Sequence, residues 1–266
     1  MKKIIIPIIL SITINSYSQN KNYFSAGIGS VHLYNDMLAS YNFSGTAVNI
    51  DYFNDNTLKN NWKSMTDVNF FYSLQKLNEK FIDRFEYKPF VSIFNFDFKK
   101  NYVKRIYNHQ KFSVFTGPFA SINLNYQLYS SAYNYTSSSN FFKADISFGL
   151  YNYMEYCFKR IKINNYTSCT FFSMLLYPNY SYDLPLVTAG NVSNYFESAT
   201  VNKKISFANK LQLEIPLYIN KKFINSFTVF HTFYGNWYNI KDSRYREFGN
   251  NINVGVIFRI HKISEL

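Results

Sequence analysis

The sequence has little charge, no long apolar run after its first segment, and no excess of helix-forming residues. Charged residues make up only 17% of the chain and hydrophobic residues 47%, which excludes an intrinsically disordered protein. After residue 18, no uninterrupted apolar stretch of about 18 residues occurs, so we expect no transmembrane helix. Leu and Ala do not dominate, which disfavours a helical bundle.

Aromatic side chains are abundant instead. They make up 21% of the 266 residues, with 25 Tyr and 28 Phe. Because Tyr and Phe favour pleated, half-buried surfaces, this composition predicts strands. No repeat or interdomain linker is evident, so one domain is preferred.

The N-terminal segment has the pattern of a secretory signal peptide. Lys2 and Lys3 precede an apolar run over residues 4–14, and small and polar residues follow up to Gln19. The run is about half the length that a membrane-spanning helix requires. We therefore predict a cleaved signal peptide at 1–18 and a single folded domain at 19–266, with a buried first strand as the alternative.

Period-two alternation dominates from residue 22 onward. In the segment 205–219, for example, odd positions are apolar except Asn209, and most even positions are polar. Such alternation places every second side chain on one face of a sheet. The pattern predicts ten strands, at 22–33, 41–53, 64–75, 88–99, 110–129, 142–158, 161–176, 204–219, 224–239 and 250–260. The strands at 161–176 and 224–239 alternate poorly, and His231 falls on the expected apolar face.

Strand length and the connections favour a membrane barrel. Several segments are longer than the ~5 to 6 residues usual in soluble sandwiches, and they reach the ~9 to 11 that a transmembrane strand needs. In a bacterial outer-membrane barrel the even-numbered connections face the periplasm and are short. Lys159-Arg160 and 220–222 fit; 54–63 and 100–108 are longer but polar. The odd connections include 75–87, 130–141, 177–203 and 240–249.

With its leader, its alternating strands and the apolar last strand Val254–Ile260, the chain resembles small outer-membrane β-barrel proteins of Gram-negative bacteria. The resemblance implies an all-β fold, a single antiparallel up-and-down transmembrane barrel of about ten strands, with eight to twelve compatible. It also implies location in the outer membrane, with outer-membrane lipids as partners.

The polar faces of the strands are expected to enclose a charged lumen. Because barrels of eight strands are filled by side chains, ten strands leave at most a narrow passage. A mixed-sign ion-pair network would close it, and a narrow gate for small solutes is the alternative. The network is predicted to comprise Asp51, Asp67, Asp97, Lys111, Glu155, Lys210, Glu214 and Arg259.

No catalytic, cofactor or metal site is predicted. His32, His109, His231 and His261 are scattered, and no two His, Cys, Asp or Glu positions repeat a metal-ligand spacing. Nucleic acid is excluded as a partner despite a pI of about 9.4, because the chain is expected to be exported and has no recognition motif.

Two further features have less specific interpretations. The longest loop, 177–203, is a candidate recognition surface through Tyr177, Tyr180 and Tyr182. If 142–158 and 161–176 form a hairpin, Cys157 lies opposite Lys162, too far from Cys169 for a disulfide. A wider loop centred on Ile163 would align the two cysteines.

The favoured function is therefore a structural or interaction role in the envelope, without a wide pore, for instance within an envelope protein complex. The alternatives are a narrow small-solute channel, an outer-membrane hydrolase, and a secreted soluble all-β binding protein.

Overall fold

The computed structural model of the chain is built from strands. It describes residues 20–35, 39–58, 60–77, 90–130, 138–176, 196–200, 204–217, 225–240 and 243–260, and the expected signal peptide lies outside these ranges. Within them, no helix is long and apolar enough to cross a membrane.

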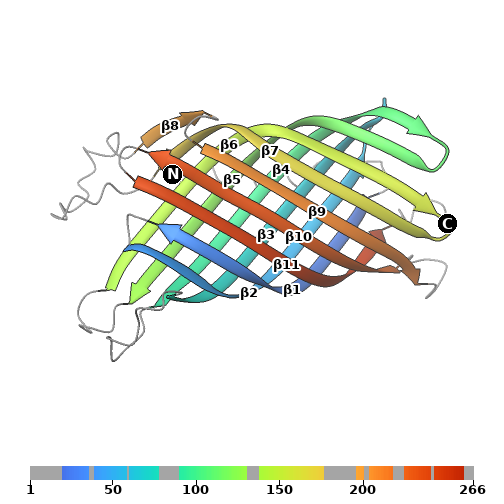
Figure 1. The fold of residues 1–266 in the computed structure, drawn as a ribbon. Helices are drawn as coiled ribbons and strands as arrows, with labels where there is room; N and C mark the ends of the chain where they lie inside the picture. Colours follow the sequence, from blue (N-terminus) through green and yellow to red (C-terminus); the bar gives the residue numbers. More distant parts are fainter. Residues whose placement is uncertain are drawn as a thin grey trace, which may run out of the picture.

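Ten long strands form a closed antiparallel barrel, and an eleventh short strand extends it (Figure 1). Neighbouring strands pair in chain order, β1 pairs with β11, and pairing of β6 with β7 closes the ring. The short strand β8 pairs with β7 beyond the point where β9 leaves it. The strands are β1 (Asn20–Asn35), β2 (Ala39–Thr57), β3 (Trp62–Leu77), β4 (Phe90–His109), β5 (Phe112–Ser130), β6 (Ser138–Phe158), β7 (Ile161–Leu176), β8 (Phe196–Thr200), β9 (Lys204–Leu217), β10 (Asn225–Ile240) and β11 (Ser243–Ile260).

The two ends of the barrel differ in their connections. One end, called here the turn end, holds the start of β1, the end of β11 and the tight turns β4–β5 and β6–β7. These two turns consist of Gln110-Lys111 and Lys159-Arg160, and a positive φ at Gln110 and Lys159 reverses the chain within two residues. The opposite end, called the loop end, holds the longer connections 78–89 and 131–137 together with the short connections 36–38 and 241–242.

Apolar side chains cover the outside of the barrel. Every barrel strand carries at least one exposed large hydrophobic residue on its outward face, among them Ile28, Val48, Phe70, Ile122 and Ile252. Soluble monomers rarely expose contiguous apolar patches of more than a few hundred square ångströms. The alternation that predicts strands from the sequence thus arises because outward positions are apolar and many inward positions are polar.

The predicted fold class is confirmed, and several predicted strand ends are wrong. β4 continues to His109 and β11 begins at Ser243, where the sequence predicts connections at 100–108 and 240–249. The loop predicted at 177–203 contains strand β8. The ends are missed because backbone pairing continues where outward side chains become polar, as at Lys104 and Arg246.

The poor alternation of β7 has a local cause. Gly149 pairs with Thr170 while Phe148 pairs with Phe172, so Phe171 has no partner on β6 and forms a β-bulge. The extra residue moves the inward positions from even numbers, such as Ser168, to odd numbers, such as Ser173. The bulge therefore leaves Ile163 in the first half of β7 and Phe172 and Met174 in the second half on the outward face. In β10, His231 does lie exposed on the outward face.

Candidate functional site in the barrel interior

Two apolar clusters fill the interior near the two ends. The turn-end cluster comprises Tyr23, Phe53, Met65, Val103, Phe115, Phe119, Tyr151, Tyr153, Tyr166, Phe230 and Ile257. The loop-end cluster comprises Val31, Leu33, Phe43, Ala47, Phe71, Val91, Ile93, Leu175, Tyr238 and Tyr245. All of these side chains are at most 5% exposed. Each end of the interior thus holds an apolar cluster, although many inward positions are polar.

Stacked aromatic rings form the centre of each cluster. In the turn-end cluster, the ring of Tyr153 stacks on those of Phe115 and Tyr166 with centroid separations of 5.1 and 4.8 Å. In the loop-end cluster, the rings of Tyr238 and Tyr245 stack at 4.5 Å. Such contacts stabilise aromatic pairs beyond their buried area.

A polar cavity of about 170 Å³ lies between the two clusters. Phe71 and Phe119 belong to opposite clusters and both line it, so each cluster borders the cavity. Its lining includes five carboxylates and four lysines, namely Asp51, Asp67, Asp97, Asp145, Glu247, Lys99, Lys143, Lys204 and Lys210. Drug-sized ligand pockets usually occupy ~300 to 1,000 Å³. The cavity is smaller than that and suits water or small ions.

The most buried ion pairs centre on Asp145. Its Oδ2 lies 3.0 Å from Nζ of Lys204 and 4.0 Å from Nζ of Lys143. Ser147 donates a hydrogen bond of 2.7 Å to the same carboxylate. The ammonium of Lys143 also lies 4.7 Å from the ring centroid of Tyr245, a cation–π contact with the loop-end cluster. Two buried lysines therefore share this carboxylate as their ion-pair partner.

Asp51 is held by neutral donors instead. Asn49 and Ser25 donate to Oδ2 at 3.4 and 3.5 Å, and Asn69 and Asn253 also donate to the carboxylate. Asn253 reaches Asp51 from β11 across the intervening strand β1, whose inward residue at this point is Gly27. A Cβ on Gly27 would lie 2.1 Å from Oδ1 of Asn253, so the absence of a side chain there permits the contact.

Carboxylates and amides alternate across five neighbouring strands. Asp51, Asn69, Asp97, Asn123 and Asp145 are successive pairing partners from β2 to β6. Like charges directly opposite each other are destabilising in a sheet. The intervening amides separate the carboxylates by two strand spacings, roughly 9.6 Å. Elsewhere on the wall, Lys210 lies 3.9 Å from Asp67 and 4.5 Å from the ring centroid of Phe230.

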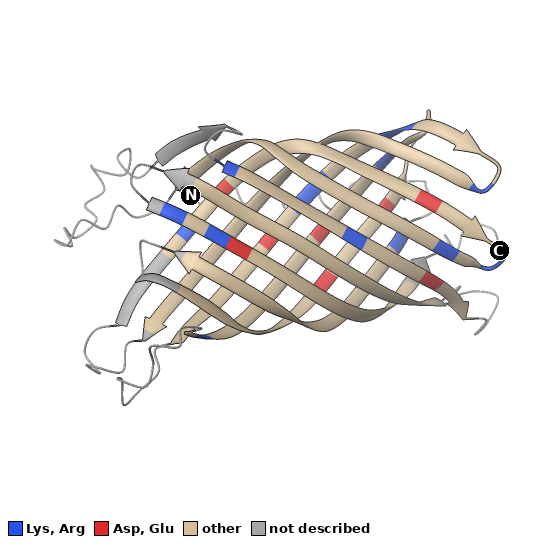
Figure 2. Cartoon of the chain, viewed as in Figure 1, with Lys and Arg blue, Asp and Glu red and all other residues tan. Residues whose placement is uncertain are grey.

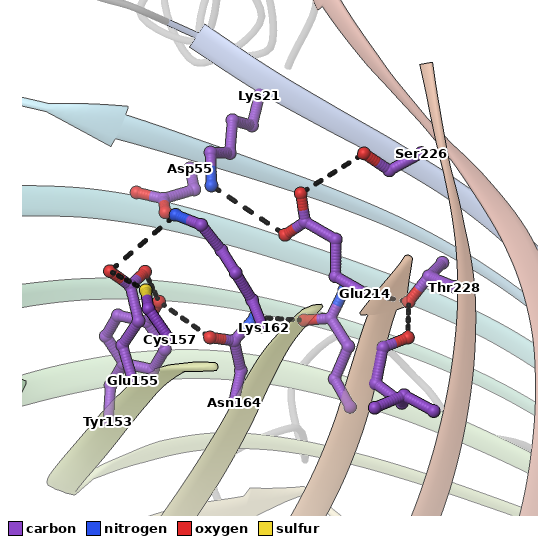
Figure 3. Close-up of polar contacts among 12 residues, drawn as sticks. Lys21, Asp55, Tyr153, Glu155, Cys157, Lys162, Asn164, Glu214, Ser226 and Thr228 are labelled. Carbon is purple, nitrogen blue, oxygen red and sulfur yellow. Dashed lines mark hydrogen bonds and ion pairs between the residues drawn. The ribbon is translucent and has the colours of Figure 1, made fainter. Parts of the chain in front are cut away.

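Charged pairs also lie in the interior at the turn end, beside the turn-end cluster (Figure 3). Glu155 Oε1 lies 3.9 Å from Lys162 Nζ, and Glu214 Oε2 lies 3.8 Å from Lys21 Nζ. The Tyr153 hydroxyl donates to Glu155 at 2.7 Å, which links these pairs to the stacked rings of the cluster. Asp55 and Lys63 form a further buried pair at 3.0 Å.

The predicted charge network is divided between these two places. Asp51, Asp67, Asp97 and Lys210 line the cavity, whereas Glu155 and Glu214 lie at the turn end. Lys111 does not belong to the network: it lies exposed in the β4–β5 turn, where strand alternation no longer determines direction. Arg259 pairs with Lys21 in the sheet, and its side chain is outside the described part, as are Tyr177, Tyr180 and Tyr182.

Sequence reasoning missed most of the basic partners and both apolar clusters. Lys143, Asp145 and Lys204 carry the most buried ion pairs, and all three have inward parity. Phe115 and Phe119 share the odd parity of polar Ser121, so the alternation itself contained the signal that aromatic rings face inward.

The described histidines lie away from the cavity. His32 and His231 are exposed on outward faces and His109 is exposed at the end of β4. No group of three or more His, Cys, Asp or Glu residues suited to a metal ion occurs in the described ranges. The chemistry that the cavity lining offers is charge compensation and hydrogen bonding.

The two cysteines lie on opposite faces and are free. Cys157 pairs with Lys162, as the two-residue turn predicts, and its Sγ is 4.0 Å from Glu155 Oε1 on the inward side. Cys169 pairs with outward Leu150, seven residues before Cys157. The alternative of a wider loop that aligns the two cysteines is therefore wrong.

A second hollow, of about 490 Å³, lies at the loop end over β1, β2 and β11. Its lining includes His32, Tyr34, Asn42, Arg244, Arg246 and Phe248, all at outward positions of their strands. We call it the basic groove. It differs from the interior cavity in carrying positive charge without a carboxylate in its lining.

Comparisons with known proteins agree with the architecture. No protein-family model and no curated protein matches the sequence. The outer-membrane protease OmpT of Escherichia coli aligns with 93% of this chain and 99% of its own, with a TM-score of 0.51 and 8% identity. The translocator domain of the autotransporter NalP of Neisseria meningitidis aligns with 96% of this chain and 92% of its own (TM-score 0.47, 6% identity). For the attachment invasion locus protein Ail of Yersinia pestis the shares are 91% and 99% (TM-score 0.34, 10% identity). The chain thus has the fold of the Gram-negative outer-membrane β-barrels.

Proposed function

We propose that the protein is an integral outer-membrane barrel with a closed interior and a structural or interaction role in the envelope. The observation that carries the proposal is the interior filling: two apolar clusters border one small ion-paired cavity. The outward apolar surface on every barrel strand supports insertion into a bilayer. On this proposal the turn end faces the periplasm, and an N-terminal signal peptide directs export.

Channel recordings test the closed interior. We expect the purified full chain, reconstituted in planar bilayers, to show no steady conductance, because aromatic clusters occupy the interior on both sides of the cavity. A porin of known conductance, reconstituted in the same bilayers, is the control. Steady open current from the unmodified protein would refute the proposal and support the second candidate, a narrow small-solute channel, which the charged cavity favours.

The native cysteines test insertion in the membrane. In protein reconstituted in lipid vesicles, we expect a charged methanethiosulfonate reagent to modify Cys157, which lies inward at the turn end, and to spare Cys169, which lies on the outward face. The variants Cys157→Ser and Cys169→Ser each keep one cysteine, so the intact mass of each variant shows whether the remaining thiol has reacted. Equal modification of both thiols in folded protein would show that the outward face is in water.

A further inference from the structure

The described acidic side chains are confined to the inward face of the barrel wall, whereas basic side chains occur on both faces. Every acidic side chain that the structure describes lies inward, in the cavity or in the pairs at the turn end: Asp51, Asp55, Asp67, Asp97, Asp145, Glu155, Glu214 and Glu247. Outward positions carry basic residues instead, including Lys76, Lys104 and Arg246. Figure 2 shows the charged positions along the wall. The described outward surface therefore attracts anions.

The basic groove places Arg244, Arg246 and His32 together near the loop end of the barrel. Arg246 of β11 pairs with Trp237 of β10 on one side and with Tyr34 of β1 on the other. Two residues closer to the turn end, Phe248 pairs with His32. Trp237 and Phe248 are themselves stacked at 6.3 Å. A guanidinium and an imidazole thus lie among aromatic rings at the rim.

On the side of the groove toward the turn end, the outward residues Ser30, Thr46 and Asn250 come first, and apolar side chains begin at the next outward position of each strand. Ile28, Val48 and Ile252 are 66%, 50% and 56% exposed at outward positions of the same three strands. Trp and Tyr gather at membrane–water boundaries, where lipid headgroups lie. The groove is therefore at headgroup level if the barrel spans a membrane, with the hydrocarbon region farther along the same strands toward the turn end.

We propose that the basic groove binds the phosphate of a lipid headgroup in the leaflet that meets the loop end. This inference rests on the proposed membrane insertion. Arg246 supplies planar paired donors that match phosphate oxygens, and His32 and Asn42 add donors from the adjacent strands. The apolar side chains farther along these strands favour a lipid over free phosphate, because only a lipid presents an acyl chain together with its phosphate.

Lipid retention in native mass spectrometry tests the assignment. The full chain in neutral detergent is offered phosphatidic acid or diacylglycerol with the same acyl chains, which differ only in the phosphate. We expect selective retention of phosphatidic acid, and a roughly tenfold weaker retention in Arg246→Gln, as loss of a hydrogen bond to a charged group implies. Lys104→Gln, which removes an exposed outward charge at the turn end, should retain the lipid as the unmodified protein does.

The other possible outcomes would overturn the groove as a site or the lipid as its ligand. Equal retention by Arg246→Gln and the unmodified protein, or equal loss in Lys104→Gln, would overturn the groove as a specific site. Displacement of the lipid by an equal concentration of inorganic phosphate would overturn the assignment to a lipid. In any of these cases the proposed function would stand if the protein still inserted in vesicles. Failure of the unmodified protein to insert would refute the proposed function itself.

Discussion

Replacement of Asp145 by asparagine is expected to lower the free energy of unfolding by about 3 to 5 kcal/mol, because removal of one member of a buried ion pair leaves an uncompensated charge. Here two lysines are affected: Lys204 and Lys143 are 4% and 2% exposed, and both lie within 4.0 Å of the lost carboxylate. Urea unfolding of the protein in lipid vesicles, followed by the fluorescence of Trp62 and Trp237, measures the change.

Two further variants separate charge from packing. The double variant Asp145→Asn/Lys204→Gln should lose less than the sum of the single losses, because it removes both charges of the 3.0 Å pair. Glu155→Gln should lose only about 1 kcal/mol, since its partner Lys162 has a side chain 31% exposed. Stability of Asp145→Asn within about 0.5 kcal/mol of the unmodified protein would contradict this account of the cavity.

Opening the barrel should require damage to both apolar clusters. We expect Tyr153→Ala alone, or Tyr238→Ala alone, to remain without conductance in planar bilayers, because the other cluster still closes the interior. The double variant Tyr153→Ala/Tyr238→Ala should produce discrete current steps. Each change removes a stacked ring, at 4.8 Å from Tyr166 in one cluster and 4.5 Å from Tyr245 in the other.

The folded state of these variants must be checked, because each Tyr→Ala change in a packed cluster costs about 3 to 5 kcal/mol. The strand content by circular dichroism, measured in the same vesicles, serves this purpose. Current from either folded single variant would show that one cluster alone closes the barrel. A silent, folded double variant would show that other side chains block the path.

The fold was largely predictable, because a lipid-facing surface imposes the same alternation on every strand. Phe142, Ile146 and Leu150 on β6 show it plainly, and the two-residue turn at Lys159-Arg160 determines that Cys157 pairs with Lys162. Beyond the outward apolar residues, outward positions also accept polar side chains, so the alternation no longer reveals a strand. Strand continuation at Ser243–Gly249 depends on backbone pairing with β1 and β10, which outward polar residues do not reveal.

The interior was less predictable than the exterior. Alternation identifies which side chains face inward, but not which of them meet across the barrel. Lys204 and Asp145 are 59 positions apart, and their contact depends on how far each strand is staggered around the ring. Polar residues alone do not identify the whole lining, because aromatic rings such as Phe53 and Phe119 also face inward.

Because Phe171 has no pairing partner on β6, we expect β7 to tolerate the deletion of this residue. Loss of a residue from a regular strand turns every later side chain to the wrong side, which the apolar exterior and ion-paired interior would not accommodate. At Phe171 the ladder with β6 already skips one residue, and removal of that residue would leave both halves of β7 in phase with β6. Of the positions in this strand, it is the one at which β6 would accept a shorter chain without repacking either face.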